Sequence, residues 1–288
     1  MKDSLADSVS FDVSPRVTPN RAPTGERAMT SAPKHTVMRD APEWRKLVDD
    51  YRRNGVVAVP RLVSPSDIAD VRVALRRYIR DTVPHLPPGD LVREADGVSV
   101  RNLWRMEKYD DYFAALGNRE DILHVVGALL GGKPVLCAVE TFNKPARHGS
   151  GVPQHQDNAY FCQDPPDMCT VWIAIDAATE QNGPVQYARG TTHTLLPHRA
   201  SGIPGNSMVM SQLREYPAEQ VTTAILEPGD AMIHHCQTVH WSTPNHTDYN
   251  RCGLLLVYRA SHTRTDPALR ELYTQAAAAF AARQDPGM

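Results

Sequence analysis

The sequence lacks the features that mark membrane, secreted and nucleic-acid-binding proteins. No apolar run approaches the roughly 20 residues that a membrane-spanning helix needs, and the first residues contain no apolar segment of a secretory signal. The 31 Lys and Arg residues are dispersed and are balanced by 33 Asp and Glu, so the formal net charge is only −2. We therefore expect neither a membrane nor a nucleic acid as a partner.

Cysteine is also sparse, with five residues at irregular spacings and no C-x-x-C pair. This pattern favours free thiols in a reducing compartment, although five cysteines leave room for one disulfide. The acidic residues near the start of the sequence argue against an organelle transit peptide. We therefore expect a cytoplasmic protein.

The apolar share of 41% is low for a globular protein, and the first part of the sequence explains this. Residues 1–40 are crowded with Ser, Pro, Thr, Arg and Asp and show no sustained periodicity, which predicts a disordered tail. The rest of the sequence contains no internal repeat and no linker. We expect residues 41–288 to form a single domain, as a monomer or a homodimer.

Apolar spacing predicts helices on both sides of a strand-rich region. One helix covers 42–54, a second begins at Ser64 as N-cap with Pro65 as its first residue, and a third lies near 119–130. A last helix is expected over 266–283.

The region from about 134 to 260 alternates short apolar segments with Gly, Pro and Asn turns. This pattern is typical of a mostly β protein whose core is a jelly roll, that is, a cupin-like double-stranded β-helix. The expected strands cover 134–142, 152–160, 169–176, 184–188, 222–226, 230–235, 238–241 and 251–259.

A His-x-Asp triplet introduces the chemistry of the sequence. On a strand, His155 and Asp157 would point to the same face. Such triplets also occur by chance, and a hydrogen-bonded histidine is the commoner explanation of an isolated one. His240, on a distant strand, would complete a facial set of two imidazoles and one carboxylate, which binds iron(II) and leaves adjacent coordination positions open.

Arg251 supports this interpretation because it leads an apolar strand and needs a carboxylate partner. An unpaired buried guanidinium is costly, and its planar fork suits bidentate binding of a carboxylate. Ser242 lies two residues after His240 on the same strand face and could donate a hydroxyl hydrogen bond to that carboxylate.

With these residues in view, the chain resembles the phytanoyl-CoA dioxygenase family, within the iron(II)- and 2-oxoglutarate-dependent oxygenases of double-stranded β-helix fold. The resemblance covers roughly residues 45–260. It is carried by His240 to Ser242 with Arg251, and by the segments 54–60 (NGVVAVP), 155–157 (HQD), 171–176 (VWIAID) and 180–184 (EQNGP).

The resemblance implies that His155, Asp157 and His240 bind iron(II) and form the catalytic centre, where dioxygen is the oxidant. Related halogenases lack the carboxylate at the position of Asp157, which lets chloride bind in its place. The presence of Asp157 therefore argues for oxygenation.

The resemblance also implies a pocket for the co-substrate 2-oxoglutarate. Its distal carboxylate would be held by Arg251 and Ser242, while Trp172 and Gln156 would line the pocket and Asn143 would contact the oxoacid end.

Substrate contacts are less constrained by the sequence. The candidates flank the expected metal ligands and are Phe142, Lys144, Asn158, Tyr160 and His235. The competing explanation is that aromatic strand residues belong to the core. The segments 84–112 and 199–220 are expected to cover the pocket mouth.

The expected reaction is hydroxylation of an unactivated C–H bond with release of succinate and CO2. We expect a small or medium-sized metabolite as substrate, such as an intermediate of natural-product biosynthesis. An acyl-CoA or amino-acid-like substrate is the alternative, and the absence of a lysine cluster for the phosphates disfavours the thioester. A zinc-dependent cupin-type enzyme and a non-catalytic metabolite-binding jelly roll are the competing classes. The zinc enzyme would leave Arg251 and Ser242 without a role.

Overall fold

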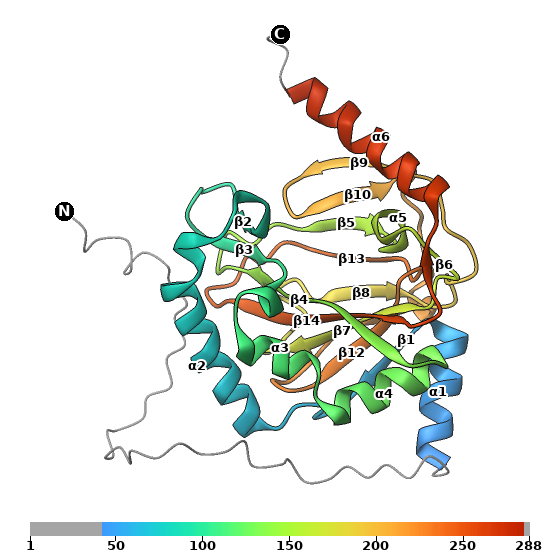
Figure 1. Ribbon diagram of the computed structural model, residues 1–288, viewed down its shortest axis with the longest axis horizontal. Coiled ribbons are helices and arrows are strands. Elements are labelled where there is room, and N and C mark those ends of the chain that lie inside the picture. Colours follow the sequence, from blue (N-terminus) through green and yellow to red (C-terminus); the bar gives the residue numbers. More distant parts are fainter. Residues whose placement is uncertain (1–41, 285–288) are drawn as a thin grey trace, which may run out of the picture.

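The computed structural model describes residues 42–284, so the predicted tail over 1–40 lies outside the described residues. Two antiparallel sheets face each other as a double-stranded β-helix, with helices packed outside the larger sheet (Figure 1). This is the mostly β jelly-roll core with flanking helices that the sequence predicts. Within residues 42–284, no helix is both long and apolar enough to cross a membrane.

The larger sheet has seven strands and spans the molecule. In spatial order they are β1 (Val56–Val59), β12 (Ala231–His235), β7 (Met168–Ala174), β14 (Arg251–Ala260), β4 (Pro134–Lys144), β3 (Val100–Leu103) and β2 (Leu91–Arg93).

The smaller sheet faces the larger one and has four strands, in the order β11 (Val221–Thr223), β8 (Val185–Ala188), β13 (His240–Ser242) and β5 (Val152–His155). Two separate two-stranded sheets are formed by β9 (His198–Ile203) with β10 (Asn206–Met210), and by β6 (Gln163–Asp164) with β15 (Arg264–Thr265).

The larger sheet is buried on both faces because helices cover its outer side. Along β7, Val171 and Ile173 belong to the cluster shared with the helices, whereas Trp172 and Ala174 belong to the cluster between the sheets. This alternation follows from the two-residue period of a strand.

The helices are α1 (Pro42–Asn54), α2 (Pro65–Asp81), α3 (Asp111–Gly117), α4 (Glu120–Leu130), α5 (Asn158–Phe161) and α6 (Pro267–Gln284). Short 3-10 turns cover Val83–His85, Pro88–Asp90, Met106–Lys108 and Ala218–Gln220. Helix α2 begins as expected, since the Ser64 side chain accepts a hydrogen bond from the Asp67 amide at 3.1 Å. Its buried residues Ile68, Val71 and Leu75 pack on the outer face of the larger sheet.

The expected strand over 152–160 is wrong in its second half. Strand β5 ends at His155, and Asp157 has helical backbone angles, with φ −61° and ψ −31°. The Asp157 carbonyl accepts hydrogen bonds from the amides of Tyr160 and Phe161, which closes the short helix α5. Asp157 therefore reaches its position from a turn, and the strand-face argument holds only for His155.

Candidate active site

The two histidines of the predicted metal site are paired directly across neighbouring strands. His155 ends β5 and is the register partner of His240, the first residue of β13, with ring centroids 4.1 Å apart. The Nε2 atoms of both rings lie 3.5 Å from Oδ1 of Asp157. One ligand atom from each of the three residues lies within 4.8 Å of the others, and all three residues are buried. The fold thus brings together the three residues that the sequence singles out.

Backbone carbonyls orient both imidazole rings. Nδ1 of His155 lies 2.9 Å from the Pro153 carbonyl, and Nδ1 of His240 lies 3.0 Å from the Thr238 carbonyl. A proton on each Nδ1 leaves the Nε2 lone pair free to bind a metal. Burial lowers the pKa of both histidines, which favours the neutral form that a metal ligand requires.

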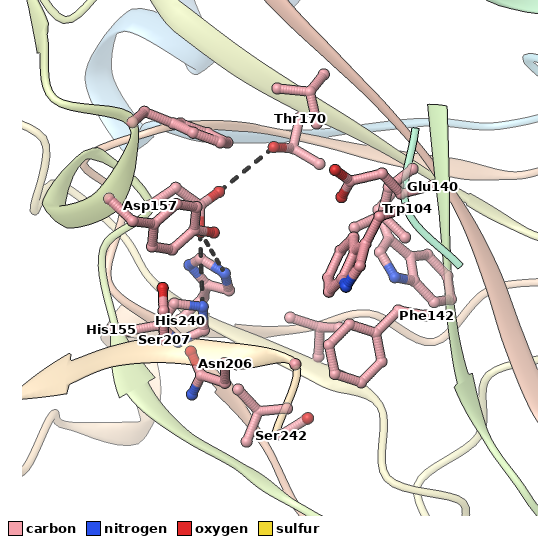
Figure 2. Close-up of a pocket in the computed structure, with 18 of the residues that line it drawn as sticks. Trp104, Glu140, Phe142, His155, Asp157, Thr170, Asn206, Ser207, His240 and Ser242 are labelled. Carbon is pink, nitrogen blue, oxygen red and sulfur yellow. Dashed lines mark hydrogen bonds and ion pairs between the residues drawn. The ribbon is translucent and has the colours of Figure 1, made fainter. Parts of the chain in front are cut away.

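Three side chains hold the Asp157 carboxylate in place (Figure 2). Nε2 of His234 lies 3.2 Å from Oδ2, Thr170 donates its hydroxyl to Oδ2 at 3.3 Å, and Tyr160 donates its hydroxyl to Oδ1 at 2.5 Å. Burial alone would raise the pKa of Asp157, but His240 and the hydrogen bond to His234 outweigh it and hold the pKa below its usual value. The carboxylate is therefore ionised and fixed, as a metal ligand should be.

A cavity of about 670 Å³ opens in front of these three residues. Its walls come from the inner faces of both sheets, and its mouth comes from segments outside the jelly roll. The mouth includes parts of both segments that the sequence places over the site, 84–112 and 199–220, together with Tyr273 of α6. The lining residues from these two segments are Gly89, Asp90, Trp104, Arg105, Ile203, Gly205, Asn206 and Ser207. The volume is typical of a small-molecule site.

Arg251 lines the same cavity and is 1% exposed. One of its terminal nitrogens, Nη2, donates to the Gly183 carbonyl at 2.9 Å. Its Nε and Nη1 are buried and have no partner among the described residues. Burial lowers the pKa of Arg251 to about 10, which leaves it charged at neutral pH. A buried guanidinium with two unused donors is matched by an incoming carboxylate.

Trp172 and Ser242 also line the cavity. The Arg251 guanidinium lies over the Trp172 ring, 5.2 Å from its centroid. Gly253 makes room for this ring, because a Cβ at that position would lie 2.2 Å from Cζ2 of Trp172. The structure therefore groups Arg251, Trp172 and Ser242 as the sequence predicts.

Two other residues assigned to the 2-oxoglutarate pocket lie behind its wall. The Gln156 side chain donates to the Thr194 and Gln237 carbonyls, at 2.9 and 2.7 Å, and anchors the loop before β9. Asn143 donates to the Val100 carbonyl at 2.9 Å and lies on the face of β4 opposite to Phe142. Neither side chain lines the cavity.

The five substrate candidates also divide. Phe142 and Tyr160 line the cavity, whereas Lys144, Asn158 and His235 do not.

The three outlying candidates have structural contacts instead. Lys144 donates to the Ser150 and Thr243 carbonyls, and burial lowers its pKa to about 6. Asn158 bonds to the backbone of Gln163 and closes the α5 turn. The ring of His235 lies on the outer side of the sheet, with its centroid 6.3 Å from that of Tyr51 in α1. Adjacent strand residues face opposite sides, and His234 is the one that lines the cavity.

Sequence reasoning did not single out several residues of the site. His234 hydrogen-bonds to Asp157. The sequence signal for it is the adjacent pair His234 and His235, of which only one can face the cavity if both lie on a strand. Trp104, Glu140 and Asn206 line the cavity as well. Glu140 had a usable signal, since it is a charged residue within the apolar strand 134–142.

The donor set fits iron(II). Two imidazoles and one ionised carboxylate converge from one side, and the cavity leaves the opposite side open. The Arg251 guanidinium, with two donors unpaired among the described residues, lines the same cavity. This geometry matches a two-histidine, one-carboxylate facial site with room for a chelating co-substrate.

The comparisons with known proteins agree with this geometry. The family model described as phytanoyl-CoA dioxygenase (PhyH) matches residues 51–253. Similar curated proteins include the L-proline trans-4-hydroxylase of Streptomyces griseoviridis, 24% identical over 75% of this chain and 87% of the relative. The ectoine dioxygenase of Streptomyces avermitilis is 24% identical over 76% of this chain and 80% of the relative.

Solved structures show the same fold. EctD from S. alaskensis with 2-oxoglutarate and 5-hydroxyectoine aligns with a TM-score of 0.67 and 18% identity, over 79% of each chain. The epimerase SnoN from nogalamycin biosynthesis, in complex with Fe3+, alpha ketoglutarate and nogalamycin RO, aligns with a TM-score of 0.62 and 21% identity, over 80% of this chain and 88% of that one. The chain therefore belongs to the phytanoyl-CoA dioxygenase family of 2-oxoglutarate-dependent non-haem iron dioxygenases.

Proposed function

We propose that this protein hydroxylates an unactivated C–H bond of a small or medium-sized metabolite, an intermediate of secondary metabolism, with release of succinate and CO2. The observation that best supports this proposal is the buried Arg251, whose Nε and Nη1 have no partner among the described residues. Arg251 lines the same cavity as His155, Asp157 and His240. A metal-binding jelly roll without an oxoacid co-substrate would leave these donors unsatisfied.

In this proposal each residue has a defined task. His155, Asp157 and His240 would hold iron(II), and the bound metal would supply the oxidising chemistry that couples dioxygen to the decarboxylation of 2-oxoglutarate. Arg251 and Ser242 bind the distal carboxylate of 2-oxoglutarate, and Trp172 positions the Arg251 guanidinium. The apolar walls exclude water, and the residues of the mouth orient the substrate C–H bond.

The size and charge of the cavity favour a small substrate over a CoA thioester. Among the residues that line it, the two arginines are Arg251, deep in the wall, and Arg105, which is paired with Asp90. Within residues 42–284, no lysine lines the cavity to receive the phosphates of CoA. The relatives named for L-proline and ectoine agree in scale with a compact metabolite. The five cysteines, all free, also support a cytoplasmic location.

An anaerobic titration tests this proposal. Iron(II) and 2-oxoglutarate added together to the protein should give a weak visible charge-transfer band, because the oxoacid chelates the metal. Arg251→Ala should weaken 2-oxoglutarate binding by roughly 100-fold, since a buried charge-assisted contact is lost, while iron(II) still binds. Absence of the band in the wild-type protein, or loss of iron affinity without loss of 2-oxoglutarate affinity in the variant, would contradict the assignment.

A further inference from the structure

Glu140 is the one carboxylate of the cavity, within the described residues, that has neither a metal-site role nor a partner. It lies on β4 opposite Leu255 of β14, and both residues line the cavity. Figure 2 shows its carboxyl group pointing into the cavity beside Trp104, across from Asp157. Within residues 42–284 it accepts no hydrogen bond and forms no ion pair, and it does not belong to the metal-ligand cluster.

The surroundings of Glu140 make an unpaired charge costly. Trp104, Phe142 and Leu255 form the neighbouring wall. Burial raises the pKa of Glu140 to about 8, the negative charges of Asp157, Glu107 and Asp90 add to this effect, and Arg105 opposes it. A carboxyl group in the wall of a cavity, without a partner among residues 42–284, indicates a ligand that satisfies it.

No residue of the described part of the chain, 42–284, supplies the missing positive charge. Arg105 is paired with Asp90 at the mouth, and the proposed function assigns the free donors of Arg251 to the distal carboxylate of 2-oxoglutarate. A cation for Glu140 must therefore come with the substrate. The adjacent indole of Trp104 and ring of Phe142 suit this, because aromatic faces attract cations in desolvated sites.

A second unsatisfied group lies on the other side of the cavity. Asn206 begins β10, lines the cavity and is 5% exposed. Its Nδ2 is buried and has no hydrogen-bond partner among the residues that the structure describes. Figure 2 places Asn206 near His155, on the opposite side of the cavity from Glu140. An amide donor in this position needs an oxygen acceptor on the ligand.

From these two groups we infer that the substrate is a small cationic or zwitterionic amine. Its ammonium group lies against Glu140 and Trp104, and a carboxylate or carbonyl oxygen of the same molecule accepts a hydrogen bond from Asn206. The molecule then spans the cavity in front of the iron ligands, which presents its carbon skeleton to the oxidising centre. This inference rests on the proposed function and names the substrate class for it.

Matched pairs of compounds test the inference on the protein loaded with iron(II) and 2-oxoglutarate. The probes are L-proline and piperidine-2-carboxylic acid, each beside its N-acetyl derivative, which keeps the carboxylate and removes the cation. Binding is measured anaerobically by the change in the charge-transfer band, and turnover is measured by succinate formation under air. The amines should bind and increase succinate formation, and the N-acetyl compounds should do neither.

The Glu140→Gln variant decides how Glu140 acts. If it binds a cation as a carboxylate, the variant loses about 100-fold in affinity for the amines, while iron and 2-oxoglutarate binding stay unchanged. If it acts instead as a neutral acid that donates a hydrogen bond, the amide replaces it and the affinity is kept, which overturns the inference. Glu43→Gln on the exposed face of α1 is the matched control and should leave all three affinities unchanged.

The remaining outcomes are also decisive. The inference is overturned if neither amine binds, or if the N-acetyl compounds bind equally well. In that case a normal charge-transfer band with iron(II) and 2-oxoglutarate still supports the proposed function. Absence of the band in the wild-type protein overturns both together.

Discussion

Individual residues divide into those whose role follows from residue type and spacing and those whose role depends on contacts. The first group contains His155, His240 and Arg251. The two histidines have the residue type and spacing of metal ligands, and Arg251 leads an apolar strand in which a guanidinium needs a partner. Gln156 and Asn143 belong to the second, because the structure uses both amides to tie backbone segments together behind the cavity wall. A sequence motif does not say which side of a strand or turn an amide faces.

The His234 and His235 pair provides a prediction at this scale. His234→Ala should weaken iron(II) binding by roughly 10- to 100-fold, because the side chain fixes the carboxylate of Asp157. His235→Ala, one residue further and facing α1, should leave the iron affinity unchanged. Iron(II) titration of both variants measures the difference. Equal loss in the two variants would mean that general destabilisation, and not the orientation of Asp157, explains the effect.

Glu140 gives a pH-dependent prediction for the protein without ligands. Its pKa is raised from 4.5 to about 8 in the folded state, so between these values the folded protein binds a proton that the unfolded chain releases. Its contribution therefore makes the folded state less stable as pH rises through this window. The stability gain of Glu140→Gln over the wild type should be larger at pH 8 than at pH 5.5, as measured by urea unfolding. A gain independent of pH would show that Glu140 does not titrate in this range.

At the scale of elements, strongly periodic segments could be predicted and segments of mixed polarity could not. Helices α1, α2 and α4 and strands β4, β7, β12 and β14 follow from apolar spacing because each has a buried face. Strands β2 and β3 and the β9–β10 hairpin were missed, since these strands are short, mix polar with apolar residues and show no clean alternation. The turn at Asp157 was missed because helix α5 is only four residues long and depends on local hydrogen bonds.

The packing of β14 against β7 provides a prediction at this scale. Gly253→Ala should displace the Trp172 indole and with it the stacked Arg251, since the new Cβ would overlap the ring. The expected cost is about 1–3 kcal/mol of unfolding free energy, together with weaker 2-oxoglutarate binding. Gly89→Ala is the control, because a Cβ there meets no atom within 4 Å. Unaltered 2-oxoglutarate affinity in Gly253→Ala would show that the position of Trp172 does not matter for the co-substrate.

At the scale of the whole molecule, the jelly roll supplies His155, His240 and Arg251, and the segments outside it supply the mouth of the cavity. The ligand histidines lie on neighbouring strands of the smaller sheet, and Arg251 begins a central strand of the larger one. The mouth is built by the region around β2 and β3, by the β9–β10 hairpin and by α6 (Figure 1). Family resemblance predicts the first part, whereas the second part required the structure.

The β9–β10 hairpin forms a two-stranded sheet of its own and shares no hydrogen-bond ladder with either face of the jelly roll. Its length and sequence can therefore change without breaking the pairing on which folding depends. Insertions, deletions or grafts between Ile203 and Asn206 would alter which molecules the enzyme accepts while leaving its oxidative machinery intact. The hairpin is thus the natural starting point for directed evolution of new selectivity, and the place where paralogues of this enzyme should diverge first.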